Sequence, residues 1–158
     1  MKEHHYNIKV EWTGNEGYGT KNYKTYNRDH TILGEHKYSD ILGSSDPSFL
    51  GDKTKYNPED LLVSSISSCH MLWYLHLCAV NNITVTSYLD NATGVMEENK
   101  DGSGKFTSVT LNPAISITDS TQESKAIELH KEANRMCFIA NSCNFEIKHN
   151  GTISIDKE

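Results

Sequence analysis

Arginine is scarce in this 158-residue chain: only Arg28 and Arg135 occur, and the lysines are scattered rather than gathered along one stripe. The formal net charge is −6, and the isoelectric point is near 5.7. A protein that binds a phosphate backbone needs clustered positive charge to neutralise it. We therefore expect no nucleic-acid partner.

Long hydrophobic runs are also missing. The longest, residues 71–80, is interrupted by His76 and falls short of the roughly 20 apolar residues that span a bilayer. The N-terminal residues 1–5 are not followed by the apolar segment of a signal peptide. These features predict a cytoplasmic protein with no membrane partner. In that compartment the cysteines are reduced by default, so a disulfide would be transient or catalytic.

Metal and phosphate motifs are absent too. The chain has eight histidines and four cysteines, but no Cys-x-x-Cys, no His-Glu-x-x-His and no other paired ligand spacing. Phosphate-binding glycine loops and a Ser-His-Asp signature are also lacking. We predict no metal and no bound cofactor, and we expect His70, His76 and His130 to be hydrogen-bonded residues at the edge of the core.

The length and the lack of a linker or repeat predict a single domain over residues 1–158. Mean hydropathy is −0.59, which is polar for a compact monomer. Some of the stability is therefore expected to come from a subunit interface, where apolar side chains of two chains pack together.

The order of periodic segments predicts an α+β fold. Residues 6–12 alternate between polar and apolar types, which is typical of a strand with one buried face. Residues 37–56, rich in Ser, Asp and Gly, are expected to form a long surface loop. The other expected strands are residues 22–36, 83–98 and 106–118, with a hairpin connection at 97–104. Residues 145–155 are expected to form a strand pair interrupted by Asn150-Gly151.

Two helices are predicted between these strands. The first starts with Asn57 as the N-cap and Pro58 at the first helical position, and it runs to about Val80. Small or apolar residues surround most of it, so we expect a central helix that is buried on several sides. The second follows a capping-box spacing from Ser120 to Glu123. One face of this second helix carries Ala126, Leu129, His130, Ala133 and Cys137.

Cys69 lies deep in the first helix, and Cys137 lies at the end of the second. A mid-helix thiol among apolar neighbours is usually an inert packing residue, and the helix N-terminus is too far away to activate it. Cys137 has more room to react at its helix end. Because both helices are expected to pack on the same sheet, a redox pair and two packed thiols are both open readings. Cys78 and Cys143 are expected to be packing residues, although Cys143 could also compete as a resolving thiol.

Arg28 and Glu59 also have two readings each. Arg28 stands beside Asp29, which is typical of a surface ion pair, but it is one of few candidates for a fixed cation. Glu59 complements the helix dipole, and it could also orient an arginine. An arginine–carboxylate fork beside a thiol would favour the thiolate and hold a peroxide oxygen.

Two parts of the chain resemble the signature of the OsmC/Ohr superfamily. The first is Asn-Pro-Glu-Asp-Leu-Leu at 57–62 followed by Ser-Ser-Cys-His-Met-Leu at 67–72. The second is His130 followed by Cys-Phe-Ile-Ala-Asn-Ser at 137–142. The resemblance covers nearly the whole chain. It implies antiparallel sheets packed around a long central helix, in an intertwined homodimer with two active sites at the subunit interface.

The resemblance also implies a thiol-dependent peroxidase that reduces organic hydroperoxides through a two-cysteine disulfide cycle. Cys69 would be the peroxidatic cysteine and Cys137 the resolving one, with Arg28 and Glu59 as the pair that activates Cys69. No cofactor is implied, and an external dithiol would act as reductant. An apolar tunnel is expected for the substrate tail. Its expected lining includes Met71, Leu72, Trp73 and Phe138.

The chain departs from the peroxidase branch at Phe138, where that branch has proline, and Cys143 is an extra thiol nearby. An alternative function is therefore a non-catalytic OsmC-like dimer that binds an apolar ligand in the interface cavity. In that case the cysteines would only pack. Thiol reactivity separates the two readings, because a catalytic Cys69 must be largely thiolate at neutral pH.

Overall fold

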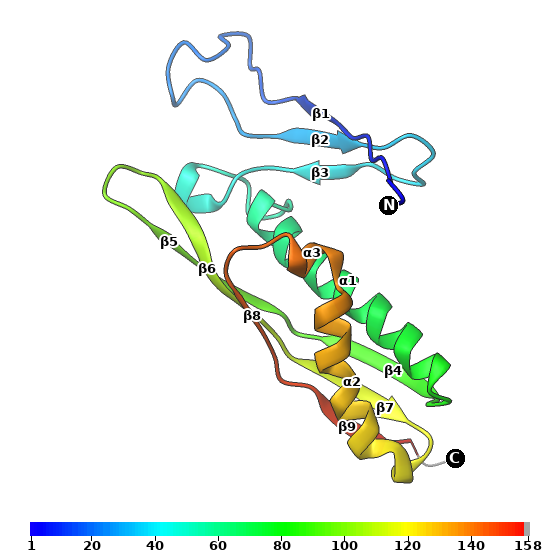
Figure 1. The fold of residues 1–158 in the computed structure, drawn as a ribbon. Coiled ribbons are helices and arrows are strands. Elements are labelled where there is room, and N and C mark those ends of the chain that lie inside the picture. Colours follow the sequence, from blue (N-terminus) through cyan, green and yellow to red (C-terminus); the bar gives the residue numbers. More distant parts are fainter. Residues whose placement is uncertain (157–158) are drawn as a thin grey trace. The chain divides into compact units, whose positions relative to one another are not determined.

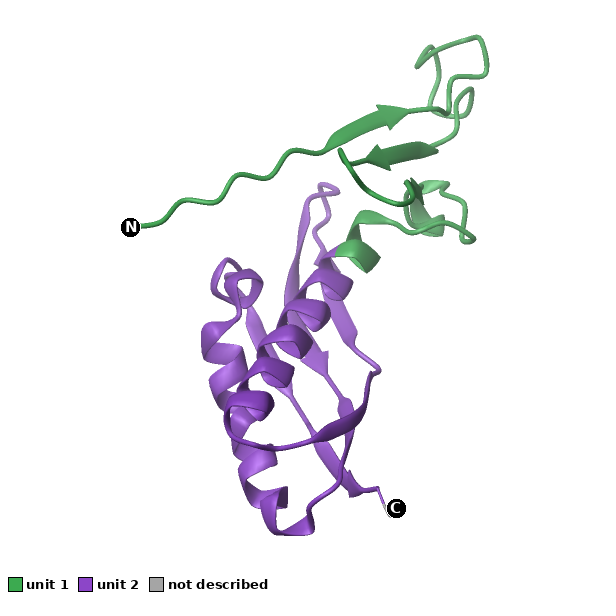
Figure 2. Ribbon diagram, turned by 90° about the vertical axis from the view of Figure 1, so that its right-hand side faces the viewer, with its two compact units in different colours: residues 1–61 green, residues 62–158 purple. Residues whose placement is uncertain are grey.

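The computed structural model describes residues 1–156, and the chain divides into two compact units, Met1–Leu61 and Leu62–Glu158 (Figure 2). The prediction of one domain over residues 1–158 stays a prediction. In chain order the elements are β1 (Lys9–Trp12), β2 (His30–Leu33), β3 (Ile41–Gly43), η1 (Pro47–Phe49), α1 (Pro58–Val80), β4 (Val85–Asp90), β5 (Thr93–Glu98), β6 (Gly104–Leu111), β7 (Pro113–Ile117), η2 (Ser120–Gln122), α2 (Glu123–Met136), α3 (Phe138–Asn141), β8 (Glu146–His149) and β9 (Thr152–Ile155).

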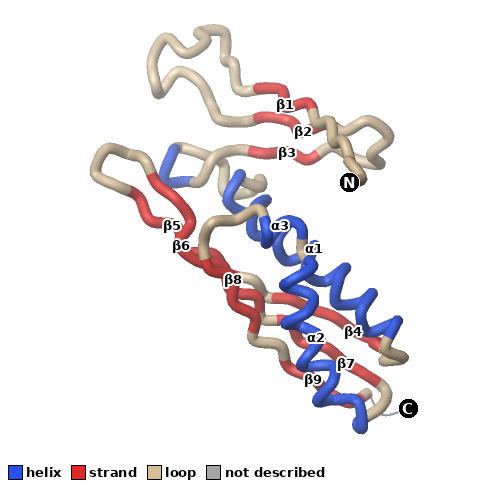
Figure 3. Tube along the Cα trace, in the orientation of Figure 1, coloured by secondary structure: helices blue, strands red, loops and turns tan. Residues whose placement is uncertain are grey.

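Unit 1 contains a three-stranded antiparallel sheet in the order β1-β2-β3 (Figures 1 and 3). All four residues of β1 are exposed, so the predicted buried face of residues 6–12 is wrong for the single chain. The second predicted strand, residues 22–36, is reduced to β2. The predicted loop 37–56 contains β3 and η1, because Thr31 pairs with Leu42 in a register that local composition does not reveal.

Helix α1 has the boundaries that its capping residues predict. Asn57 Oδ1 accepts a hydrogen bond from the Asp60 amide at 2.7 Å, and Asp60 Oδ2 accepts one from the Asn57 amide at 3.2 Å. At the C-terminal end Asn82 has φ 58°, and the Ile83 amide donates to the Cys78 carbonyl at 2.9 Å. This left-handed residue and its six-residue hydrogen bond end the helix in a Schellman motif.

One stripe of α1 is buried, rather than several sides as predicted. The stripe consists of every fourth residue: Ile66, His70, Tyr74 and Cys78. Leu72, on another side, is 63% exposed in the chain. By length and composition alone α1 could cross a membrane, but the core helix of a globular protein meets the same two criteria.

Unit 2 contains two three-stranded sheets, in the orders β4-β7-β9 and β5-β6-β8. The predicted strands 83–98 and 106–118 are each split in two, and β5 and β6 form the predicted hairpin with Gly102 at φ 83°. The predicted strand pair at 145–155 is wrong in its pairing. Strand β8 pairs in parallel with β6, and β9 pairs in parallel with β7, so the two strands join different sheets.

Helix α2 buries the predicted face, since Ala126, Leu129, His130 and Ala133 are all buried and Cys137 follows at 0% exposure. Its predicted capping box is wrong. Ser120 starts the short helix η2, and the Asp119 side chain accepts a hydrogen bond from the Thr121 amide at 2.9 Å. Helices α1 and α2 lie on the same side of the unit 2 strands (Figure 2). The main core lies between these layers and includes Tyr74, Cys78, Ile83, Ile115, Ile117, Ala126, Leu129 and Ala133.

Candidate functional site

The contact between α1 and α2 brings the two cysteines together. Three contacts lie along it: Cys69 with Cys137, His70 with His130, and the Tyr74 hydroxyl with the Ala126 carbonyl at 3.2 Å. Residue numbers rise along α1 while those of the contacted residues fall along α2, so the helices are antiparallel. The two thiols thus lie on helices that pack on the same side of the strands, as the sequence predicted.

Cys137 lies where α2 ends and α3 begins. Its backbone is extended, and its Sγ accepts a hydrogen bond from the Ala140 amide at 3.4 Å as the N-cap of α3. Burial, with the neighbouring Cys69 side chain as the next cause, raises the pKa of the Cys137 thiol to about 11. Cys137 is therefore protonated at neutral pH, with the Cys69 side chain beside it.

Cys69 is placed differently. It precedes His70 on α1, so it lies beside the buried stripe, and it is partly exposed in the chain. Cys137 is fully buried, so Cys69 is the more accessible of the two thiols to an external reagent. The pair thus combines an accessible sulfur with a buried thiol that can reach it.

The apolar surface near Cys69 is only partly the predicted one. Leu72, Trp73 and His76 of α1 line a cavity of about 270 Å³. The ring of Phe138, 68% exposed, meets the Trp73 ring edge-on at 5.7 Å between centroids. Met71, which was expected in the same tunnel, lines a different cavity together with Ser67 and Asp90.

Arg28 and Glu59 both belong to unit 1. The Arg28 guanidinium lies over the Tyr23 and Tyr26 rings, at 4.2 and 4.4 Å from their centroids. It also donates to the Tyr26 carbonyl at 2.5 Å and to the Tyr23 carbonyl at 2.8 Å. The expected ion pair with Asp29 is not formed, because Asp29 pairs with Lys55 instead.

Glu59 lies in the first turn of α1, where its charge complements the helix dipole, and it is half-buried. Within residues 1–156 no side-chain hydrogen bond or ion pair involves Glu59. Its dipole role therefore matches the first of the two sequence readings, and its role toward an arginine stays a prediction.

The other two thiols pack as predicted. Cys78 is buried in the main core beside Tyr74, and burial raises its pKa. The Cys143 thiol donates to the Ile139 carbonyl at 3.3 Å and is partly buried against a second core cluster around Ile66 and Val109.

The histidines are where sequence reasoning missed most. His70 and His130 are not at the edge of the core but inside it, at 1% and 2% exposure. Each occupies a buried-stripe position of its helix, which is the signal that could have placed them. Among the described residues no group of three or more His, Cys, Asp or Glu side chains is arranged to hold a metal ion.

Comparisons with known proteins agree with this architecture. The family model for OsmC-like proteins matches residues 51–150. The chain belongs to the OsmC-like protein family. This match covers both cysteines and the contact between α1 and α2. No curated protein sequence matches the chain.

Solved structures of OsmC-like proteins have the same fold. An OsmC-like protein of unknown function from Vibrio cholerae has a TM-score of 0.83 and 29% identity, over 95% of this chain and 100% of that one. An OsmC-like protein from Mycoplasma pneumoniae has a TM-score of 0.71 and 18% identity, over 99% and 100%. An organic hydroperoxide resistance protein from Elizabethkingia anophelis has a TM-score of 0.65 and 16% identity, over 98% and 100%. The mixed α+β fold is thus that of the OsmC-like family.

Proposed function

We propose that this OsmC-like chain is a thiol-dependent peroxidase that reduces organic hydroperoxides, with Cys69 as the peroxidatic and Cys137 as the resolving cysteine. The observation that carries the proposal is the contact between a partly exposed Cys69 sulfur and the buried, protonated Cys137 thiol. Family relatives named organic hydroperoxide resistance proteins support the substrate class.

In the first step the Cys69 thiolate attacks the distal oxygen of the hydroperoxide. The O–O bond breaks, the alkoxide takes a proton to become the alcohol, and Cys69 is oxidised to a sulfenic acid. In the second step the Cys137 sulfur attacks the Cys69 sulfur, and the hydroxyl leaves as water with the Cys137 proton. An external dithiol then restores both thiols by two exchange reactions, and no bound cofactor is required.

Arg28 and Glu59 complete the proposal as the pair that activates Cys69, in a homodimer with its active sites at the subunit interface. For this role the Arg28 guanidinium would have to leave Tyr23 and Tyr26. An arginine freed in this way presents five donors to a peroxide oxygen and a thiolate, which lysine cannot reproduce. Arg28→Lys is therefore expected to slow the first step without preventing disulfide formation by other oxidants.

The test is to treat the reduced protein with one equivalent of cumene hydroperoxide at neutral pH and to map disulfides by mass spectrometry. We expect a Cys69–Cys137 disulfide in the wild type. In Cys137→Ser we expect one sulfenic acid per chain, trapped at Cys69 by dimedone. Cys69→Ser should show neither product. Cys78→Ser, a buried thiol of the same helix, is the matched control and should behave as the wild type.

A non-catalytic dimer that binds an apolar ligand is the second candidate. The cavity lined by Leu72, Trp73 and His76, and the engagement of Arg28 by tyrosines, favour it. Four free thiols after the cumene hydroperoxide treatment, or full peroxidase turnover in Cys69→Ser, would reject the two-cysteine cycle and leave this second candidate.

A further inference from the structure

Two buried histidines join α1 to α2, and the proposed thiol chemistry gives them no role. His70 Nε2 and His130 Nδ1 are 3.0 Å apart, and the two rings are parallel within 5° with centroids 5.4 Å apart. Both side chains are almost fully buried. A buried polar pair of this kind is held in place by its own hydrogen bond, because no water competes for it.

Aromatic rings surround the pair. The Tyr74 ring of α1 stacks on His130 at 4.1 Å, and behind it lies Tyr88 of β4. His149 at the end of β8 stacks on both histidines, at 5.7 Å from His70 and 6.1 Å from His130. The groups that face the pair from α1, β4 and β8 are therefore phenols and another imidazole.

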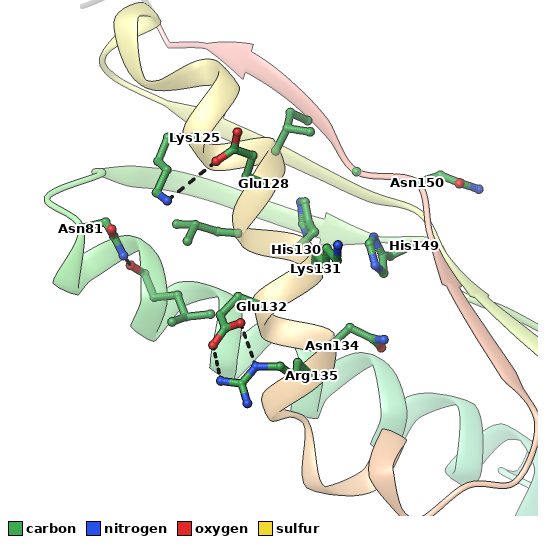
Figure 4. A pocket seen from close by; sticks show the side chains of 14 residues that line it. Asn81, Lys125, Glu128, His130, Lys131, Glu132, Asn134, Arg135, His149 and Asn150 are labelled. Atoms are coloured by element: carbon green, nitrogen blue, oxygen red, sulfur yellow. Dashed lines mark hydrogen bonds and ion pairs between the residues drawn. The ribbon is translucent and has the colours of Figure 1, made fainter.

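No carboxylate in the described part of the chain forms an ion pair with these histidines. The acidic residues nearest along α2 line a groove that His130 borders, and they are paired with basic residues of the same helix: Glu128 with Lys125 and Glu132 with Arg135 (Figure 4). Asn134, one turn after His130, adds an uncharged amide whose buried Oδ1 has no hydrogen-bond partner within the part of the chain that the structure describes. The surroundings offer no counter-ion for a charged imidazole.

The number of protons that the two imidazoles can bind is therefore limited. A single proton lies in the contact between His70 Nε2 and His130 Nδ1, and the outer nitrogens, His70 Nδ1 and His130 Nε2, have no hydrogen-bond partner among residues 1–156. A further proton would place a positive charge in an apolar contact between helices. Burial lowers the pKa of His70 to about 4 and that of His130 to about 3, with His149 and His70 as further causes.

The pair is adjacent to the cysteines on both helices. His70 directly follows Cys69, and His130 precedes Cys137 by seven residues, which is about two turns on the same face of α2. The contact that fixes α1 against α2 at the histidines therefore also fixes the approach of the two sulfurs. A disulfide requires Cα atoms within roughly 4.4–6.8 Å, so a small separation of the helices would prevent it.

We propose that His70 and His130 are positioning residues for the Cys69–Cys137 disulfide. As a neutral hydrogen-bonded pair they hold α1 against α2, and protonation of the pair separates the helices and disfavours the disulfide. This inference rests on the proposed function, in which that disulfide forms in each cycle.

The test measures the Cys69–Cys137 disulfide equilibrium in buffers of reduced and oxidised dithiothreitol, with a diselenide catalyst to speed exchange in acid. Two protein thiols lose two electrons and two protons to the oxidised reagent, which becomes the dithiol. The equilibrium constant is therefore independent of pH while all thiols are protonated. A thiolate at Cys69 would make the constant rise in acid, which is opposite to the proposed effect.

We expect the constant of the wild type to stay level between pH 7 and pH 5 and to fall about tenfold between pH 5 and pH 3, at pH values where circular dichroism shows the native fold. The test variant is His70→Gln combined with His130→Asn, because these amides can reproduce Nε2 and Nδ1 without titrating. Its constant should change by less than about twofold. His76→Gln removes an exposed histidine of the same helix and should keep the wild-type profile.

Three outcomes would overturn the proposal. The equilibrium constant of the wild type does not fall in acid, the constant of the double variant falls as much as that of the wild type, or the Cys69–Cys137 disulfide never forms. If the double variant does not fold, proton NMR of the wild type decides: His70 or His130 titrating with a pKa near 6.5 in the folded protein would also overturn it. This exchange with dithiothreitol uses no peroxide. If the protein does not react with cumene hydroperoxide but its disulfide equilibrium constant still falls in acid, the peroxidase function alone is rejected.

Discussion

At the scale of single residues, Cys69 and Cys137 touch each other and yet have opposite surroundings. Cys137 is fully buried, and its pKa is raised to about 11, mainly by burial. Cys69 is partly exposed. From the sequence alone, Cys137 was expected to have more room to react. The structure buries it instead, because accessibility at a helix end depends on what packs over it.

This asymmetry predicts the order of alkylation. With limiting iodoacetamide at pH 8, we expect Cys69 to be modified first and Cys137 to stay unmodified, since a thiol of pKa about 11 is roughly one-thousandth ionised at that pH. Peptide mapping by mass spectrometry measures both sites. Unfolding in guanidinium chloride is the control and should expose all four cysteines. Equal rates at Cys69 and Cys137 in the native protein would contradict the prediction.

Arg28 shows the limit of sequence reasoning for a single side chain. Its neighbour Asp29 indicated a surface ion pair, and the family resemblance indicated a catalytic cation. The structure gives it a third environment, between Tyr23 and Tyr26, because the loop turns back so that two carbonyls and two rings face the guanidinium. No periodicity in the sequence encodes that turn.

At the scale of elements, helix boundaries were predictable where the cap is local. Asn57 and Pro58 fixed the start of α1 within one residue, since the cap involves residues three apart. The capping box at Ser120 failed because Asp119 competes as the acceptor one residue earlier. Strands were less predictable. The parallel pairing of β8 with β6 depends on residues about 38 apart in sequence, as in the pair Ser108–Glu146.

The cap of α1 can be tested directly. Asn57→Ala removes the oxygen that accepts the Asp60 amide, and we expect it to lower the free energy of unfolding by about 1 kcal/mol. Asn57→Asp keeps an acceptor at the same position and should lie within about 0.5 kcal/mol of the wild type. Urea unfolding followed by circular dichroism measures both. If Asn57→Asp lowers the free energy of unfolding as much as Asn57→Ala does, the Asn57 side chain does not stabilise the protein as a helix cap.

At the scale of the whole molecule, the polar composition and the exposed apolar side chains both favour a subunit interface. Low mean hydropathy predicted that a subunit interface contributes to stability, and Leu72 and Val80 of α1 are at least 60% exposed in the single chain. The homodimer itself stays a prediction. The sequence could locate the helices that carry both cysteines, but not the buried histidines between them, because their burial results from the packing of α2 on α1.

These histidines make the stability of the molecule depend on pH. His70 and His130 have folded pKa values of about 4 and about 3, below the ordinary value near 6.5. The unfolded chain therefore binds more protons than the folded chain in acid. Stability is fully present above pH 6.5 and is lost as the pH falls toward 4. We expect the free energy of unfolding to fall by about 2–4 kcal/mol between pH 7 and pH 5.

Urea unfolding at fixed pH values measures this slope. The double variant His70→Gln/His130→Asn should have a flatter profile over the same range, whereas His76→Gln should keep the full slope because His76 is exposed. The carboxylates with lowered pKa, such as Asp46 and Asp119, lose their stabilising contribution at lower pH and are unchanged in both variants. An identical acid slope in the double variant would mean that groups other than this buried pair set the acid limit of the fold.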